Sequence, residues 1–120
     1  MLRKVTDQKM FSKSPGVEMH VLVEPAEMYE AGRLCNRITI APGASITSHI
    51  HLDEMEAFYV VTGTCKMEDN HETVYLTKGD VLITPHNQSH AIYNDSSEPV
   101  ELIAMIISTK QGIPGSSKAM

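Results

Sequence analysis

GASITSHIHLDEMEAFYVVTG, residues 43 to 63, holds three side chains that can bind a metal ion. His49 and His51 are two residues apart, and residues two apart on a β-strand point to the same face. Glu56 opens the apolar run AFYVV, so we expect it at the start of the next strand. Residues 52–55 are long enough for a turn between antiparallel strands, which would return the carboxylate to the two imidazoles. The stretch therefore predicts a metal site.

Outside this stretch, short apolar segments alternate with turn residues, and no amphipathic helix is evident. Residues 17–24, 33–40 and 100–107 are typical of strands, whereas 25–32 fit one helical turn or a loop. Short strands at regular spacing, bounded by Gly, Pro and Asn-Asp turns, indicate an all-β sandwich or barrel. We expect about eight strands, a number typical of a small closed barrel or a double-sheet roll.

The chain of 120 residues suits one domain, and its 42% hydrophobic content is enough for a real core. Residues 1–16 are polar and end in the turn signal SPG, so we expect a loosely held N-terminal arm. The barrel should cover residues 17–109. Residues 110–120 are rich in Gly and Ser and are expected to form a flexible C-terminal tail.

Charge and composition exclude several classes of function. The formal net charge of −5 argues against a nucleic-acid-binding protein, which needs a basic patch. The N-terminus has no apolar segment typical of a signal peptide, and the longest apolar run is too short to span a bilayer. Cys35 and Cys65 form no short-spaced motif, so we expect reduced thiols in a cytoplasmic protein.

A second informative stretch is GDVLITPHNQSHAIYN, residues 79 to 94. His90 shares a strand face with Ile92, which we expect to point into the barrel. A neighbouring strand in such a barrel can place His90 beside His49 and His51. Three imidazoles and one carboxylate would then converge inside the fold.

The two stretches resemble the two motifs of the cupin family. The first motif is Gly, five residues, His-x-His, three or four residues, Glu, six residues, Gly. The chain matches it with four residues between His51 and Glu56, and the matching positions are Gly43, His49, His51, Glu56 and Gly63.

The second motif is Gly, five residues, Pro-x-Gly, two residues, His, three residues, Asn. Gly79, Pro85, His90 and Asn94 match it, whereas Asn87 stands where the family has Gly. Asn is the residue other than Gly that best tolerates positive φ, so we expect the turn to survive. The resemblance, to a small single-domain cupin of the type 2 kind, implies a double-stranded β-helix or jelly-roll barrel. It also implies a metal bound by His49, His51, Glu56 and His90.

Three imidazoles and a carboxylate suit Fe, Mn, Ni, Co or Zn as one divalent ion per chain, and the sequence does not choose between them. Such a ligand set leaves two adjacent positions of an octahedron open, although a closed tetrahedral zinc site is an alternative. The resemblance implies an oxygenase, decarboxylase or isomerase that acts on a carboxylic or keto acid or a sugar-like molecule. The alternative is a non-catalytic barrel that binds or senses a small ligand. No catalytic residue beyond the metal ligands is identified.

Several other residues are weaker candidates. His86 lies in a loop beside the second motif and could contact a ligand. Phe58, Ile92 and Met105 are either pocket lining or core, and Asn36 is a polar residue on an apolar strand face. We further expect a homodimer that interacts with a small-molecule ligand and with neither nucleic acid nor membrane.

Overall fold

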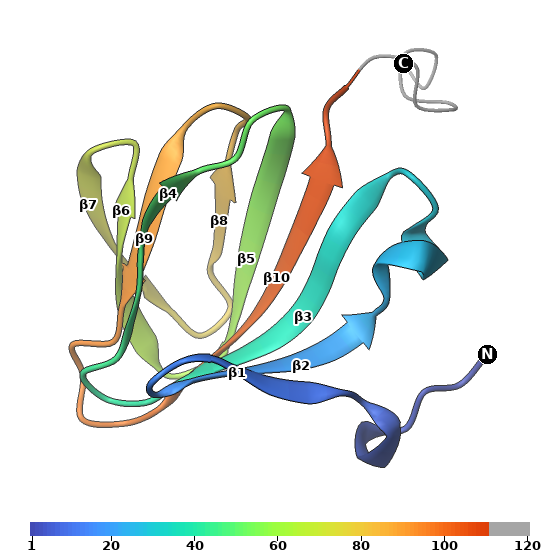
Figure 1. The fold of residues 1–120 in the computed structure, drawn as a ribbon. Coiled ribbons are helices and arrows are strands. Elements are labelled where there is room, and N and C mark those ends of the chain that lie inside the picture. The colour runs from blue at the N-terminus through green and yellow to red at the C-terminus, as the bar shows by residue number, and fades with distance from the viewer. Residues whose placement is uncertain (111–120) are drawn as a thin grey trace.

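Ten β-strands make up most of the computed structural model, which describes residues 1–110 (Figure 1). Two short 3-10 turns, η1 (Val5–Asp7) and η2 (Pro25–Met28), are the helical elements among these residues. The prediction of an all-β chain is confirmed, with ten strands rather than about eight. The strands are β1 (Met10–Ser14), β2 (Val17–Val23), β3 (Gly32–Ile40), β4 (Ser45–Ile50), β5 (Glu54–Thr62), β6 (Thr64–Asp69), β7 (Glu72–Thr77), β8 (Val81–Thr84), β9 (Ser89–Tyr93) and β10 (Val100–Ser108).

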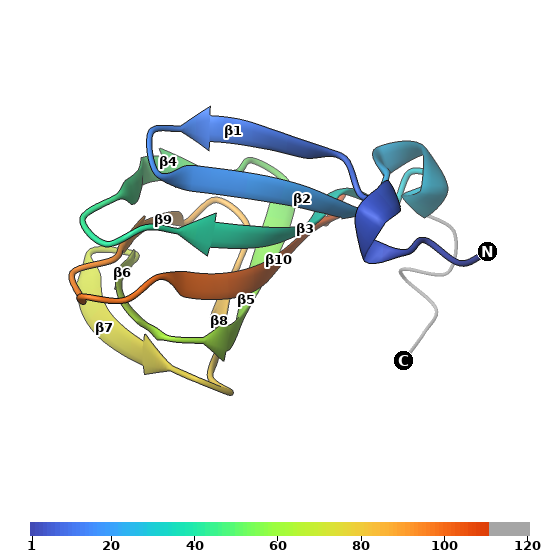
Figure 2. The same cartoon turned by 90° about the horizontal axis from the view of Figure 1, so that it is seen from below.

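Two antiparallel sheets face each other. The larger sheet has the strand order β1-β2-β3-β10-β5-β8, and the smaller has the order β4-β9-β6-β7. Figure 1 shows the larger sheet curving from β1 round to β8, opposite the smaller sheet. In Figure 2, seen from below, β1, β2, β3 and β10 lie side by side along one wall. The result is a two-sheet barrel, as predicted.

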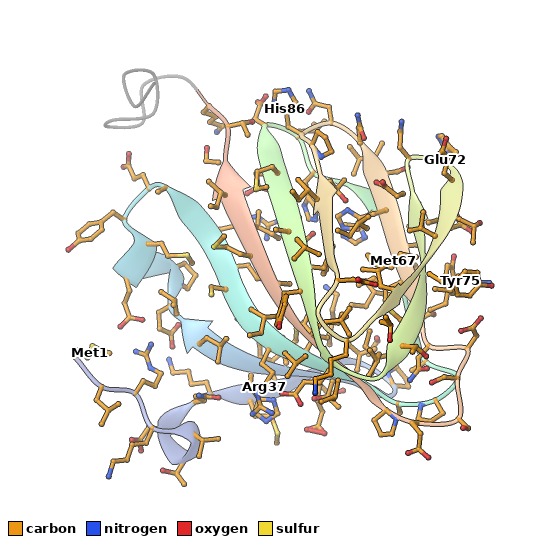
Figure 3. All side chains as sticks on the ribbon, turned by 180° about the vertical axis from the view of Figure 1, so that it is seen from behind. Met1, Arg37, Met67, Glu72, Tyr75 and His86 are labelled. Atoms are coloured by element: carbon orange, nitrogen blue, oxygen red, sulfur yellow. The ribbon has the colours of Figure 1, made fainter. Side chains whose placement is uncertain are left out.

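The core lies between the sheets because side chains alternate along each strand. On β5, Phe58 and Val60 are buried, whereas Tyr59 between them is 45% exposed. Figure 3 shows the same contrast on the smaller sheet, where Met67 lies between the sheets and Tyr75 projects from the outer face. Burial of this apolar interior is the main favourable contribution to folding.

The turn between β6 and β7 explains why that pair forms a tight hairpin. Asn70 and His71 have φ of 48° and 73°, and the type I′ turn, which matches strand twist, requires positive φ at both of its central positions. His71 is exposed at the tip of this hairpin.

The expectation of a loosely held arm over residues 1–16 is wrong for its second half. Met10–Ser14 form β1, which pairs with β2 and places Phe11 opposite Met19. The strand has no buried side chain, so it lacks the alternation from which strands are recognised. Arg3 also ties the chain start to η2 through two hydrogen bonds of 2.8 Å to the Glu27 carboxylate. The predicted tail at 110–120 lies outside the described residues, apart from residue 110.

The relation between the two motif strands also differs from expectation. β4 and β5 are not paired, because β4 pairs with β9 whereas β5 pairs with β10 and β8. The connection between them crosses from the smaller to the larger sheet, and β5 begins at Glu54, two residues earlier than predicted. The crossing still returns a carboxylate to the imidazoles, now from the opposite wall of the barrel.

Candidate metal centre

Four side chains converge between the two sheets. His49, His51, Glu56 and His90 each offer one ligand atom, and these atoms all lie within 4.8 Å of one another. His49 on β4 is directly opposite His90 on β9, and Glu56 comes from β5 in the larger sheet. The structure therefore brings together all four residues singled out in the sequence.

A β-bulge in β4 aims the two histidines of the first motif. Ile46 pairs with Ile92, but His49 pairs with His90, so β4 contains one more residue than β9 over this interval. Ile46 and His49 are an odd number of residues apart and yet both face the interior, which regular alternation would forbid. The bulge therefore allows both Ile46, which packs in the core, and His49 to face the interior.

The distances within the cluster are short. Nε2 of His90 lies 3.1 Å from Nε2 of His49 and 2.9 Å from Oε1 of Glu56. Nε2 of His51 lies 3.0 Å from the same carboxylate oxygen. Nε2 of His51 and Oε1 of Glu56 are buried and have no partner in hydrogen-bond geometry. Buried polar atoms without a partner are costly, and a cation among these atoms would satisfy them, so the donor set fits a metal ion.

Outer partners orient the imidazoles. Nδ1 of His49 lies 2.7 Å from the carbonyl oxygen of Thr47, which can only accept, so the neutral ring presents the lone pair of Nε2 to the cluster. Nδ1 of His51 lies 2.9 Å from Nη2 of Arg33 and 3.5 Å from Oε1 of Glu54. Arg33 is bonded in turn to Glu54 at 2.6 Å. The Thr47 carbonyl and the Glu54 carboxylate can accept the Nδ1–H of His49 and His51, which fixes ring orientation at metal sites and leaves each Nε2 free for a cation. Arg33 can only donate, so it supports the site by holding Glu54.

Burial lowers the pKa of His51 below its usual value. The Glu56 carboxylate opposes this shift, and electrostatic interactions with His49, His90 and Arg33 reinforce it. A lowered pKa keeps the His51 imidazole neutral at pH 7, which is the form that binds metals.

A cavity of about 680 Å³ opens onto the cluster. His49, His51 and Glu56 line it, whereas His90 is buried behind them with Phe58 edge-on to its ring at 5.2 Å. The cavity is bounded by strands of both sheets and by the turn between β1 and β2. The remaining lining residues are Lys13, Ser14, Pro15, Met19, Arg33, Leu34, Ile38, Gly43, Ala44, Ser45, Ile46, Thr47, Phe58 and Ile106.

The weaker candidates separate in the structure. Phe58 lines the cavity, as one of its two predicted roles requires, and Ile92 is core. Met105 is 38% exposed on the outer face, so both interior roles predicted for it are wrong. Asn36 is buried beside the Met19 sulfur, and it is not among the cavity-lining residues. His86 is exposed and bonds to Thr109 at one end of the barrel (Figure 3), and it is not among the cavity-lining residues.

Arg33 is the residue that the sequence did not reveal. On a regular strand Arg33 shares a face with Arg37, opposite the apolar residues of 33–40, and would point to solvent. Its side chain is indeed 51% exposed. It nevertheless lines the cavity and contacts His51, because it lies near the start of β3, at the rim of the barrel. A long side chain at a strand end can reach round to an interior site, which no alternation pattern would show.

The two asparagines of the second motif have structural roles. Asn87 has φ of 64°, which confirms that the turn tolerates Asn in place of Gly. Its backbone N–H donates to the His51 carbonyl at 2.9 Å, and its Oδ1 accepts from the Asp53 N–H at 3.1 Å. Asn87 therefore holds the loop that carries His51. Asn94 is buried and bridges neighbouring backbone segments by donating to the carbonyls of Ile40 and Glu98.

The chain matches the pattern of the cupin domain over residues 36–106, which is more than half of its length and includes all four clustered residues. The chain belongs to the cupin family. This cupin is 35% identical to an oxalate-binding protein of Thermotoga maritima over 91 residues, which are 76% of this chain and 75% of that protein.

Two solved structures show the same fold. A predicted oxalate decarboxylase of Thermotoga maritima superposes with a TM-score of 0.81 at 31% identity, over 90% of this cupin and 99% of that chain. KdgF from a Halomonas species gives a TM-score of 0.75 at 20% identity, over 93% and 96% of the two chains, which indicates the fold alone. In the part of the chain that the structure describes, no helix is long and apolar enough to cross a bilayer.

Proposed function

We propose that this cupin binds one divalent transition metal through His49, His51, Glu56 and His90, and that the site takes a small carboxylic or keto acid. The observation that carries the proposal is the convergence of these four side chains, three of them on the wall of a cavity large enough for a ligand. Bound there, a divalent metal supplies Lewis acidity and open positions for an oxygen-rich anion, and Fe or Mn also supports reaction with O₂.

Two further features support an acid as the ligand. Arg33 lines the cavity next to His51, and a guanidinium is well suited to a carboxylate because its N–H donors match the two oxygens. The Thermotoga maritima relative is named for binding oxalate, a small dicarboxylate. A sugar-like ligand lacks the negative charge that the arginine would recognise.

The cavity lining bears on whether the protein is an enzyme. Within residues 1–110, the titratable groups of the lining are Lys13, Arg33 and three of the proposed ligands. Lys13 is exposed. The carboxyl and imidazole groups of the lining are all proposed metal ligands, so none of them remains free to move a proton at a bound substrate. This favours an oxygenase, or a barrel that only binds its ligand, over an isomerase or a decarboxylase that depends on a separate base.

The first experiment is elemental analysis of protein purified without an affinity tag, beside the Glu56→Ala variant. We expect about one Fe, Mn, Co, Ni or Zn per chain, and its loss from the variant. Calorimetry with oxalate should then show binding to metal-loaded protein and none after chelation. No metal after reconstitution, or equal metal in the variant, would contradict the ligand assignment. O₂ consumption in the presence of bound acid would distinguish an oxygenase from a binding protein.

We also propose that the chain forms a homodimer in the cytoplasm. The outer face of the larger sheet exposes Tyr59, Val81, Ile83 and Met105 on the neighbouring strands β5, β8 and β10. Exposed apolar surface of this kind often marks a protein interface. Both cysteines are free thiols, which suits a reducing compartment. A monomeric mass by light scattering at micromolar concentration would contradict the dimer.

A further inference from the structure

The cavity beside the proposed metal site is elongated, and strand register shows its direction. Ile106 on β10 is opposite both Glu56 and Leu34, so Leu34 lies level with the metal cluster. Ile38 is four residues farther along β3, which is about 13 Å at 3.3 Å per residue. Met19 is opposite Ile38 and also lines the cavity. The cavity therefore reaches from the metal cluster well along the interior of the larger sheet.

The two ends of this cavity differ in chemistry. The cluster end carries His49, His51 and Glu56, with the Arg33 guanidinium bonded to His51. Beyond it, β2, β3, β5 and β10 of the larger sheet present an apolar wall, and Ile46 of β4 continues it on the opposite side. Lys13 and Ser14 of β1 line the cavity past the level of Ile38. The apolar wall of the larger sheet consists of Met19, Leu34, Ile38, Phe58 and Ile106.

The size of the cavity decides against a minimal ligand. A water molecule takes about 30 Å³ of liquid volume, so a cavity of 680 Å³ has room for roughly twenty water-sized groups. A two-carbon dicarboxylate such as oxalate would fill a small part of that volume. Its two carboxylates are joined by a single C–C bond, so both would stay at the cluster end and leave the apolar wall uncovered.

We propose that the preferred ligand is an amphipathic monocarboxylate, namely a carboxylic or 2-oxo acid with an aliphatic or aryl body several carbons long. Its carboxylate lies at the cluster end beside Arg33, and its body lies along the apolar wall toward Ile38. The inference rests on the proposed function, because it assigns the substrate class of the same site. It differs from the ligand named for the Thermotoga maritima relative.

The test is calorimetric binding of pyruvate, 2-oxohexanoate, 2-oxooctanoate and phenylpyruvate to metal-loaded full-length protein, with oxalate alongside. Because each buried methylene contributes to affinity, the Kd should fall about fourfold per added methylene until the wall is covered. Oxalate as the tightest ligand, or a Kd independent of chain length, would overturn the inference and leave the proposed function intact. Failure of every acid to bind, with metal loaded, would overturn the proposed function itself.

A matched pair of variants locates the gain on the apolar wall. Leu34→Gln places a polar group on the wall, and Ile83→Gln makes the same kind of change on the outer face, where Ile83 is 58% exposed. The ratio of the pyruvate Kd to the 2-oxooctanoate Kd should drop at least fivefold in Leu34→Gln. That ratio should stay within twofold of wild type in Ile83→Gln. Circular dichroism and metal content should first show that both variants are folded and loaded. Equal Kd ratios in Leu34→Gln and Ile83→Gln would then overturn the placement of the ligand body on the apolar wall.

Discussion

Asn94→Ala should destabilise the barrel strongly while leaving its metal content unchanged. The Asn94 side chain is 1% exposed and makes four hydrogen bonds. Nδ2 donates to the carbonyls of Ile40 at 2.9 Å and Glu98 at 2.8 Å. Oδ1 accepts from the backbone N–H and the hydroxyl of Ser96 at 3.0 and 2.7 Å. At about 1 kcal/mol for each bond, the free energy of unfolding should fall by roughly 3–4 kcal/mol.

Urea unfolding measures this loss, since the midpoint should fall while the slope of free energy against denaturant stays constant. Asn36→Ala is the matched control, because Asn36 is also buried, at 5% exposure, but within residues 1–110 its one side-chain hydrogen bond goes to the Met19 sulfur at 3.8 Å. It should lose about 1 kcal/mol, a typical cost for one weak buried contact. Equal losses in the two variants would refute the argument that bridging by Asn94, rather than burial alone, stabilises the fold. Loss of metal from the folded Asn94→Ala variant would refute the argument that Asn94 stabilises the barrel without affecting the proposed metal site.

Three other predictions concern a proposed metal ligand, an ion pair and a buried thiol. His51→Ala should lose most of its metal by elemental analysis and keep a folded circular dichroism spectrum, because His51 follows the end of β4 and is not part of the core cluster. Full metal in the variant would remove His51 from the ligand set. The bond to Arg3 lowers the pKa of Glu27 to about 2 from 4.5, so its stabilising contribution is present above pH 4.5 and lost as the pH falls toward 2. Arg3→Gln should therefore lower the urea midpoint more at pH 7 than near pH 2, where the bond from Arg3 to the Leu22 carbonyl is the main one left to lose. An equal effect at both pH values would exclude the ion pair as the cause. Burial raises the pKa of the Cys65 thiol to about 11. A thiol reagent at pH 8 should therefore label the partly buried Cys35 first and Cys65 only on unfolding. Simultaneous labelling of both thiols would contradict the burial of Cys65.

Much of the site was predictable because its chemistry is local in sequence. His49 and His51 were placed on one face by their spacing alone, and the structure keeps them together. The bulge that directs them inward could not be inferred, because it appears only as a register shift against β9, a strand some forty residues away. Arg33 was missed for a related reason, since its approach to His51 depends on how β3 meets the rim of the barrel.

The fold was predictable where one side of a strand is buried. β5 and β10 alternate between apolar and exposed residues, and both were recognised. β1 was missed because it is the edge strand of its sheet and no side chain of it is buried. The partners of β4 and β5 were misjudged because neighbours in sequence usually pair, whereas here the chain crosses to the other sheet.

The extra residue between Ile46 and His49 bears on how the first motif can change in length during evolution. Deletion of the codon for Thr47 or Ser48 would leave Ile46 and His49 two residues apart, the same spacing as Ile92 and His90 opposite them, so a regular ladder would still direct both imidazoles inward. Every ligand residue would still be encoded, but the five residues between Gly43 and His49 would become four. A descendant sequence can therefore depart from the family spacing and keep the ligand cluster, so a search by fixed spacing alone would overlook it.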